Sequence, residues 1–182
     1  MTKDSIETKR LLEHLKSLEH DGYQFESAEH SFDLLIHKLL GRFQPFFALN
    51  EYNVSIHEFS ANRNNNAVAK VKISVGDQVE SVSAEGDGPV NALDKAIRKA
   101  LERFYPQISE VRLVDYKVRV LDSDKATAAK VRVLIESADQ NGSWTTIGVS
   151  TDIIDASWRA MLDAIEYKLL RDSQAAKHLA AA

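Results

Sequence analysis

The sequence contains no cysteine, and its 182 residues include only three prolines and two methionines. Without cysteine the chain forms no disulfide, has no thiolate nucleophile and holds no Cys-ligated zinc. It also lacks the run of about 20 apolar residues that a membrane-spanning helix needs, and its first residues lack the apolar core of a signal peptide. We therefore expect a cytoplasmic protein without a membrane partner.

Motifs of catalytic and metal centres are missing as well. The sequence has no Gly-x-Ser-x-Gly elbow, no Gly-x-x-x-x-Gly-Lys phosphate loop and no His-Glu-x-x-His motif. Of its six histidines, His30 and His37 are seven residues apart on one predicted helix, but no further ligands stand at close spacing. We therefore expect these histidines to be solvated or packing residues, and no metal site.

One pattern occurs twice along the chain. Residues 67–73 reappear in similar form as residues 127–133, and the helical pattern that follows is repeated with alanines at equivalent places. A repeated supersecondary unit usually means that two copies stack about a pseudo-twofold axis. The seam between such copies is a natural place for a ligand or a second subunit.

The apolar periodicity predicts the order of the elements. A period near 3.6 predicts helices over residues 5–20 and 27–40, and a period of 2 predicts strands near 54–59, 67–75 and 79–84. A helix over 89–104 follows, and the order then returns with strands over 115–121, 126–136 and 143–149 and a helix to about residue 171. We predict an α+β fold: two βββα units related by a pseudo-twofold axis, preceded by a short helical linker subdomain.

Basic residues alternate with apolar ones on three of these strands. Such a face could bind RNA, and the element order coarsely resembles a double-stranded-RNA-binding domain. A half-exposed antiparallel sheet would also have a polar outer face. Interspersed acids and a net charge of -4 favour this second interpretation over nucleic acid as a partner. The basic pairs are Lys70/Lys72, Lys117/Arg119 and Lys130/Arg132.

The starts of the two repeated helices occupy equivalent places. A helix N-terminus offers unpaired N–H groups and a positive dipole end, which suit a carboxylate. Gly86 and Gly88 allow close backbone approach at the first start, while Ile153 and Ile154 add an apolar wall at the second. An α-amino acid with an aliphatic tail would fit such a place, although glycine before a helix can also be just a turn residue.

Three stretches follow one another along the chain: the Gly-rich residues 85–92, residues 113–118 followed by 127–131, and residues 144–157. All three resemble the C-terminal regulatory domain of 2-isopropylmalate synthase and citramalate synthase, in the right order over about residues 50–171. The later stretches, with Trp144 and Trp158, are closer to the citramalate synthase branch. Residues 1–45 resemble the helical connector that follows the catalytic barrel of these enzymes.

The resemblance implies a domain organisation. Residues 1–48 would be the helical connector. Residues 49–172 would be the regulatory domain, with repeat one over about 50–105 and repeat two over about 112–171. Residues 173–182 would be a frayed tail.

The resemblance also implies a homodimer that binds the end-product amino acid. Backbone N–H groups near Gly88 would hold its carboxylate, an apolar group would hold its tail, and Asp87 or Asp115 would take its ammonium. Asn91 stands where the family motif often has an acid, and a neutral amide is a weaker ammonium partner. The implied contact residues are Gly86, Asp87, Gly88, Val90, Asn91, Leu113, Tyr116, Val120, Thr127 and Ile153.

In the parent enzyme, such binding would inhibit the condensation of acetyl-CoA with a 2-keto acid at a distant divalent-metal site. These 182 residues contain neither that barrel nor its His-x-His motif, so we expect no catalysis and no cofactor in this chain alone. The motifs favour isoleucine feedback on citramalate synthase. Leucine sensing by 2-isopropylmalate synthase is the alternative, and an RNA-binding or purely structural dimerisation module is an alternative of another class.

Overall fold

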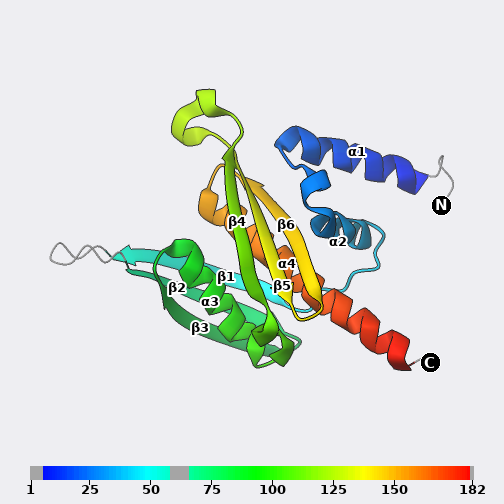
Figure 1. The fold of residues 1–182 in the computed structure, drawn as a ribbon, viewed down its shortest axis with the longest axis vertical. Helices are drawn as coiled ribbons and strands as arrows, with labels where there is room; N and C mark the ends of the chain where they lie inside the picture. The colour runs from blue at the N-terminus through cyan, green and yellow to red at the C-terminus, as the bar shows by residue number, and fades with distance from the viewer. Residues whose placement is uncertain (1–5, 58–65, 181–182) are drawn as a thin grey trace. The chain divides into compact units, whose positions relative to one another are not determined.

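The computed structural model describes residues 6–57 and 66–180 (Figure 1). They form two compact units: Pro45–Arg112, and the described parts of Met1–Gln44 and Leu113–Ala182 together. We name them the β1–β3 unit and the β4–β6 unit. No helix in the described residues combines the length and the apolar character that crossing a membrane requires.

The β1–β3 unit is a three-stranded antiparallel sheet covered on one face by a helix. Its strands β1 (Ala48–His57), β2 (Asn66–Val75) and β3 (Gln78–Gly86) lie in sequence order. Helix α3 (Pro89–Glu102) packs on β2 and β3, and a short turn η2 (Pro106–Glu110) follows it. Alternation along β2 buries Val71 and Ile73 and leaves Lys70 and Lys72 exposed.

The β4–β6 unit repeats this plan and adds the N-terminal helices. Its sheet has the order β4 (Arg112–Val120), β5 (Val131–Asp139) and β6 (Gly142–Ser150), and α4 (Ile153–Ala180) packs on β5 and β6. Helix α1 (Ile6–Asp21) leads through η1 (Phe25–Ser27) to α2 (Glu29–Leu39), which lies beside β6 and α4 (Figure 1). Residue Ala28 is buried against Ile147 and Val149, so this connector segment belongs to the core of the unit.

The predicted α+β class with two βββα units is confirmed. In both units an alanine recurs every fourth residue on the helix face that meets the sheet, and these small side chains let helix and sheet approach closely. The alanines are Ala92, Ala96 and Ala100 on α3 and Ala156, Ala160 and Ala164 on α4, all buried. The pseudo-twofold relation and the boundaries of the connector and regulatory domain stay predictions.

Three strands begin at residues other than those expected, since β1 begins at Ala48 and not near residue 54, and β4 begins at Arg112 and not at residue 115. The strand predicted from residue 126 begins at Val131, and a 3-10 segment, η3 (Ser123–Ala128), stands before it. The amide of Lys125 donates to the carbonyl of Asp122 (3.0 Å), and Ala126 has a φ of 50°. This local turn interrupts the extended conformation.

Helix α4 continues to Ala180, beyond the end expected near residue 171, and the fraying of residues 173–182 stays a prediction. Residues 58 and 59 of the first expected strand lie outside the described residues.

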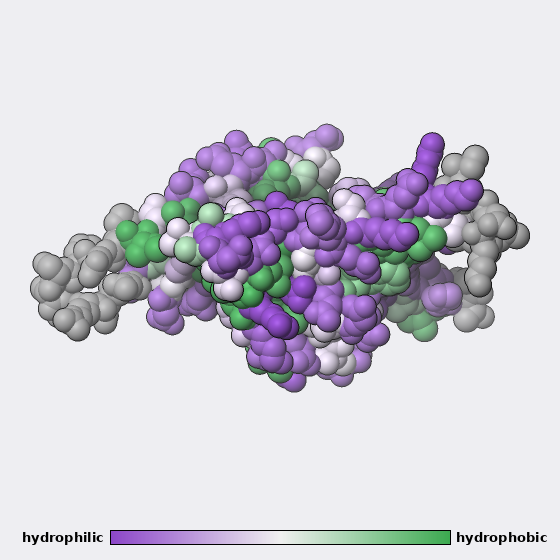
Figure 2. All heavy atoms as spheres, turned by 90° about the horizontal axis from the view of Figure 1, so that it is seen from above, coloured by the Kyte–Doolittle hydropathy of each residue, from purple (hydrophilic) through white to green (hydrophobic). Residues whose placement is uncertain are grey.

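Figure 2 shows one face of the molecule. The surface on this face is largely hydrophilic, with separate hydrophobic patches.

Candidate functional site

The first half of the predicted site is the start of α3. Gly88 is the N-cap residue and no side chain caps this helix end. The Asn91 side chain turns back instead, because its Oδ1 accepts from the amide of Asp87 (3.4 Å). Asn91 therefore braces the loop before the helix, and no side chain among residues 6–57 and 66–180 caps the first turn.

Neither the backbone conformation nor the packing at position 88 requires glycine. Its φ of -172° is ordinary extended backbone, and a Cβ there would meet nothing within 4 Å. A Cβ on Gly86, by contrast, would lie 2.5 Å from the amide nitrogen of Ala92. The other glycines are explained by positive φ at Gly22, Gly41, Gly76 and Gly142, or by close contact at Gly148. The absence of a side chain at Gly88 keeps the start of α3 open.

The start of α4 is different because the chain fills it. The carboxylate of Asp152 accepts from the amide of Ile154 (2.7 Å), and Ser150 Oγ accepts from the amide of Asp152 (3.1 Å). A carboxylate already occupies this helix end, as favoured by the helix dipole. Of the two helix starts, only that of α3 lacks a side-chain acceptor among the described residues.

The second half of the predicted site lies where β4 faces α4. The hydroxyls of Tyr116 and Ser157 share a hydrogen bond of 2.7 Å, and Ser157 Oγ donates to the carbonyl of Ile153 (2.6 Å). Val120 stands on the same face of β4 as Tyr116 by strand alternation. Val120 and Ile153 are both exposed, at 52% and 43%, so this part of the unit presents apolar surface.

Leu113 and Thr127 stand apart from this group. Leu113 is an odd-numbered residue of β4 and faces away from Tyr116 by alternation, while Thr127 is exposed in η3. Asp115 is paired with Lys117, whose hydrogen bond lowers the pKa of the carboxyl. Five of the ten predicted residues thus lie in each unit, and their joining into one site stays a prediction.

Comparison with protein families decides what kind of domain this is. Residues 26–169 match the model of the LeuA allosteric (dimerisation) domain.

The chain belongs to this family.

The relatives of this LeuA domain are biosynthetic enzymes by name. An (R)-citramalate synthase from Geobacter sulfurreducens is 47% identical over 173 residues, which cover 95% of this chain and 33% of the relative. One from Synechocystis sp. is 49% identical over 162 residues, covering 87% and 30%. A 2-isopropylmalate synthase from Aquifex aeolicus is 32% identical over 132 residues, covering 71% and 24%. The chain spans about a third or less of the length of these relatives.

The family match begins inside η1, so it includes α2. This agrees with the way the LeuA domain holds its connector. Lys130 Nζ donates to Asp21 Oδ1 (2.9 Å), and Arg132 donates to the carbonyl of Gly22 and to Gln24 (both 2.7 Å). These two basic residues therefore hold the segment before α2, so this one of the three basic pairs is engaged within the chain.

The contacts that α2 makes were not predicted from the sequence. His30 Nδ1 accepts from the amide of Thr145 (3.0 Å), and Ser31 Oγ accepts from the amide of Ile147 (3.0 Å). Ser31 Oγ also donates to Asp163 on α4 (2.8 Å). β6 is an edge strand, so these side chains bind amides that no neighbouring strand takes up.

A buried ion cluster holds the other end of the LeuA domain's second sheet. Asp139, at the β5–β6 hairpin, accepts from Lys168 (2.7 Å) and Arg171 on α4, and Arg171 lies over the Trp144 ring. Burial by itself raises the pKa of Asp139, but the hydrogen bonds from Lys168 and the Asn141 amide and the charge of Arg171 outweigh it and lower the pKa. Asp139 is therefore ionised and structural.

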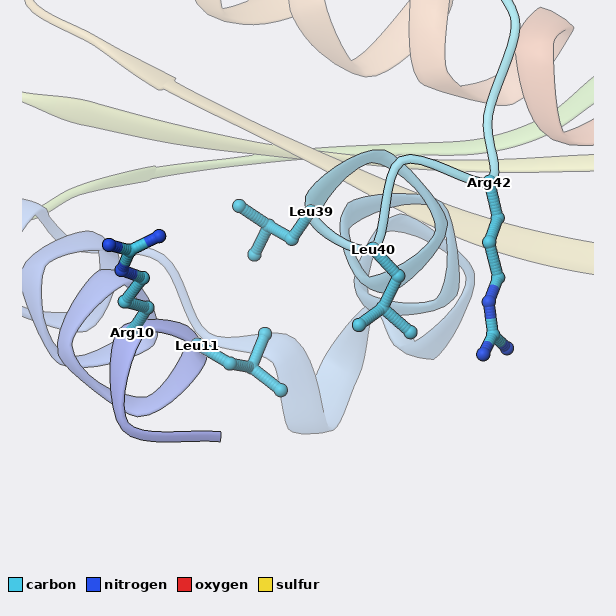
Figure 3. Close-up of a pocket in the computed structure, with 5 residues that line it drawn as sticks. All are labelled: Arg10, Leu11, Leu39, Leu40 and Arg42. Atoms are coloured by element: carbon cyan, nitrogen blue, oxygen red, sulfur yellow. The ribbon is translucent and has the colours of Figure 1, made fainter. Parts of the chain in front are cut away.

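A hollow of about 380 Å³ lies between α1 and α2 and contains none of the ten predicted residues (Figure 3). Leu11 and Leu40 point into it, and Arg10 and Arg42 stand on its two sides (Figure 3). Within residues 6–57 and 66–180, no three His, Cys, Asp or Glu side chains form a group that could hold a metal ion.

Proposed function

We propose that this chain is the isoleucine-binding regulatory domain of a citramalate synthase, and that it mediates feedback inhibition and homodimerisation. The family is described as allosteric and dimerising, and five relatives named (R)-citramalate synthase are 37–49% identical to most of this chain. The relative named 2-isopropylmalate synthase is less similar, at 32%. This order of similarity favours isoleucine over leucine as the effector.

The single observation in the structure that carries the proposal is the open start of α3. Neither the backbone conformation nor the packing at position 88 requires glycine, and within the described part of the chain no side chain caps this helix start. Backbone amides at a helix start suit a carboxylate. The equivalent start of α4 is already filled by Asp152, so we place the effector carboxylate at α3.

The remaining roles follow from the β4–β6 unit. Tyr116, Val120 and Ile153 provide the apolar surface for the effector's tail, and Ser157 ties Tyr116 to the first turn of α4. Asp87 is the better ammonium partner, because Asp115 is already paired with Lys117. The catalytic barrel, its divalent metal and its substrates acetyl-CoA and a 2-keto acid would belong to the rest of the parent enzyme.

Calorimetric titration of this chain with isoleucine and with leucine tests the proposal. A pocket separates these isomers by the position of one methyl group, worth roughly 1–3 kcal/mol, so we expect isoleucine to bind about tenfold tighter or better. The reverse order would assign the chain to leucine sensing. No heat and no rise in melting temperature with either amino acid at millimolar concentration would reject amino-acid sensing.

Light scattering of the same samples tests dimerisation. A dimer that binds neither isoleucine nor leucine would support a purely structural dimerisation module. Salt-dependent binding of duplex RNA would support the RNA-binding alternative instead.

A further inference from the structure

Helix α2 joins the β4–β6 unit through a set of polar contacts that we name the α2 junction. It comprises His30, Ser31 and Lys38 on α2, Thr145 and Ile147 on β6, and Asp163 and Glu166 on α4. One hydroxyl, that of Ser31, connects all three elements, because it accepts from β6 and donates to α4. Ser31 is 3% exposed, so water has little access to these bonds.

The ion pairs in the α2 junction are compatible with two positions of α4 along α2, which we call registers. Lys38 Nζ lies 2.7 Å from Glu166 and 3.3 Å from Asp163. These acids are three residues apart on α4, which corresponds to about 4.5 Å along the helix axis. If α4 slides against α2, Lys38 keeps one acid in either register, whereas the single Ser31–Asp163 bond breaks.

Burial of its carboxyl groups makes the α2 junction sensitive to a change in the register of α4 against α2. It raises the pKa of Asp163 and of Glu166, although the charge of Lys38 works against it. Each carboxylate therefore depends on Lys38 and, for Asp163, on Ser31. A cavity of about 170 Å³, lined in part by Ser31, Lys38 and Asp163, borders these groups and gives the Asp163 side chain room to move.

α4 also touches the proposed effector surface. Its first turns carry Ile153 and Ser157, and Ser157 bonds to Tyr116 on β4. Asp163 stands ten positions after Ile153 on the same helix, which corresponds to about 15 Å. A helix is stiff over that length, so a displacement of its start reaches Asp163.

We propose that the α2 junction is the coupling element of the domain: contact of the effector's tail with Ile153 in the first turn of α4 changes the register of α4 against α2, and the Ser31–Asp163 hydrogen bond reports that register to the connector. This inference rests on the proposed function and adds the route by which binding is passed on. Coupling needs contacts that differ between two states, and the Ser31–Asp163 bond is such a contact. Ser31 is a positioning residue and does not touch the effector.

Amide hydrogen exchange on this chain, with and without saturating isoleucine, tests the inference. In the unmodified chain we expect isoleucine to change exchange in residues 25–44 by on the order of tenfold. In Ser31→Ala we expect that change to disappear, while calorimetry shows an isoleucine affinity within about threefold of the unmodified chain. Ser173→Ala is the matched control, because the Ser173 hydroxyl donates to the carbonyl of Leu170 within α4 itself.

Two further variants keep the test decisive. Ser31→Thr retains a hydroxyl, so the response in residues 25–44 should return. Lys38→Gln sits at the exposed side of the junction and replaces Ser31→Ala if that variant does not fold; it should also reduce the response.

The outcomes separate the two ideas. Isoleucine binding without any change in residues 25–44, or a full change in folded Ser31→Ala, overturns the coupling role and leaves the proposed function standing. If neither isoleucine nor leucine binds the unmodified chain, the proposed function fails and this inference falls with it.

Discussion

The hydroxyl of Tyr116 on β4 and the hydroxyl of Ser157 on α4 lie 2.7 Å apart and share a hydrogen bond. Since Ser157 Oγ donates its own hydrogen to the carbonyl of Ile153 (2.6 Å), Tyr116 is left as the donor of the shared bond. The edge strand is thereby tied to the first turn of the helix that covers the sheet. Both Tyr116 and Ile153 belong to the proposed effector surface, so one hydrogen-bonded chain holds two of its residues.

Tyr116→Phe removes this tie and keeps the ring. We expect a loss of about 1 kcal/mol of unfolding free energy, the usual worth of one such bond. We also expect isoleucine affinity to fall about threefold to tenfold, because Ile153 is no longer held against β4. Thermal unfolding and calorimetry measure the two effects.

Tyr105→Phe is the matched control for Tyr116→Phe. The Tyr105 hydroxyl donates to the carbonyl of Phe46 (2.6 Å), in the β1–β3 unit and beyond the C-terminal end of α3. Tyr105→Phe should lower the unfolding free energy by a similar amount and leave the affinity for isoleucine unchanged. Equal affinities in both variants would remove Tyr116 from the effector surface.

Gly88→Ala separates binding from folding at the start of α3. The new methyl group enters open space and extended backbone accepts it, so the melting temperature should stay within about 2 °C. The methyl group would stand where the effector carboxylate approaches, and we expect isoleucine affinity to fall by on the order of tenfold or more.

Gly86→Ala gives the opposite result in the same loop. Its Cβ would lie 2.5 Å from the Ala92 nitrogen and 2.6 Å from Asn91 Oδ1, so we expect a loss of about 2 kcal/mol or more in unfolding free energy. If Gly88→Ala binds isoleucine as tightly as the unmodified chain, the carboxylate is bound elsewhere.

Much of the fold is readable from the sequence because it is local and repeated. The repeat of one pattern along the chain predicted two βββα units, and the change of apolar period from near 3.6 to 2 predicted where strands follow the first helices. The start of β5 was predicted wrongly. Residues 126–130 fit a period of 2 equally well, and only the turn closed by Asp122 and Lys125 makes them 3-10 and irregular.

The contacts of α2 were missed for a different reason. His30 and Ser31 bind β6 amides more than a hundred positions later in the chain, and no local pattern encodes such a pair. The available signal was weak: a serine on the inward face of an amphipathic helix, where an apolar residue is usual. Asp152 at the start of α4 was readable, since an acid before a helix is a common cap.

Asp139→Asn tests the ion cluster at the β5–β6 hairpin. Lys168 is 2% exposed and loses the ionised partner that lies 2.7 Å away in the unmodified chain, so at pH 7 we expect a loss of about 3 kcal/mol of unfolding free energy. Urea unfolding measures it. Asp124→Asn, in the exposed turn η3, should stay within about 0.5 kcal/mol.

Asp139→Asn also tests how the stability that Asp139 contributes depends on pH. The folded-state pKa of Asp139 lies below its ordinary value of 3.8, so its contribution is complete above that value and is lost as pH falls through the lowered pKa. The difference between the unmodified chain and Asp139→Asn should therefore shrink as urea unfolding is repeated from pH 4 down to pH 2. A difference that is constant with pH would assign the effect to packing and not to the charge.

His30→Ala tests the edge of β6. Without the imidazole, the Thr145 amide loses its acceptor at a half-buried position, and the edge contact with Tyr167 (ring centroids 4.7 Å apart) goes too. We expect exchange of the Thr145 amide to rise about tenfold and unfolding free energy to fall by about 1–2 kcal/mol. His37→Ala is the matched control on the same helix, because the His37 side chain lies beside Asp33 (3.8 Å) on α2 itself, and it should leave the Thr145 amide unchanged. If both variants speed Thr145 exchange equally, the effect comes from the stability of α2 as a whole and not from the bond that His30 accepts.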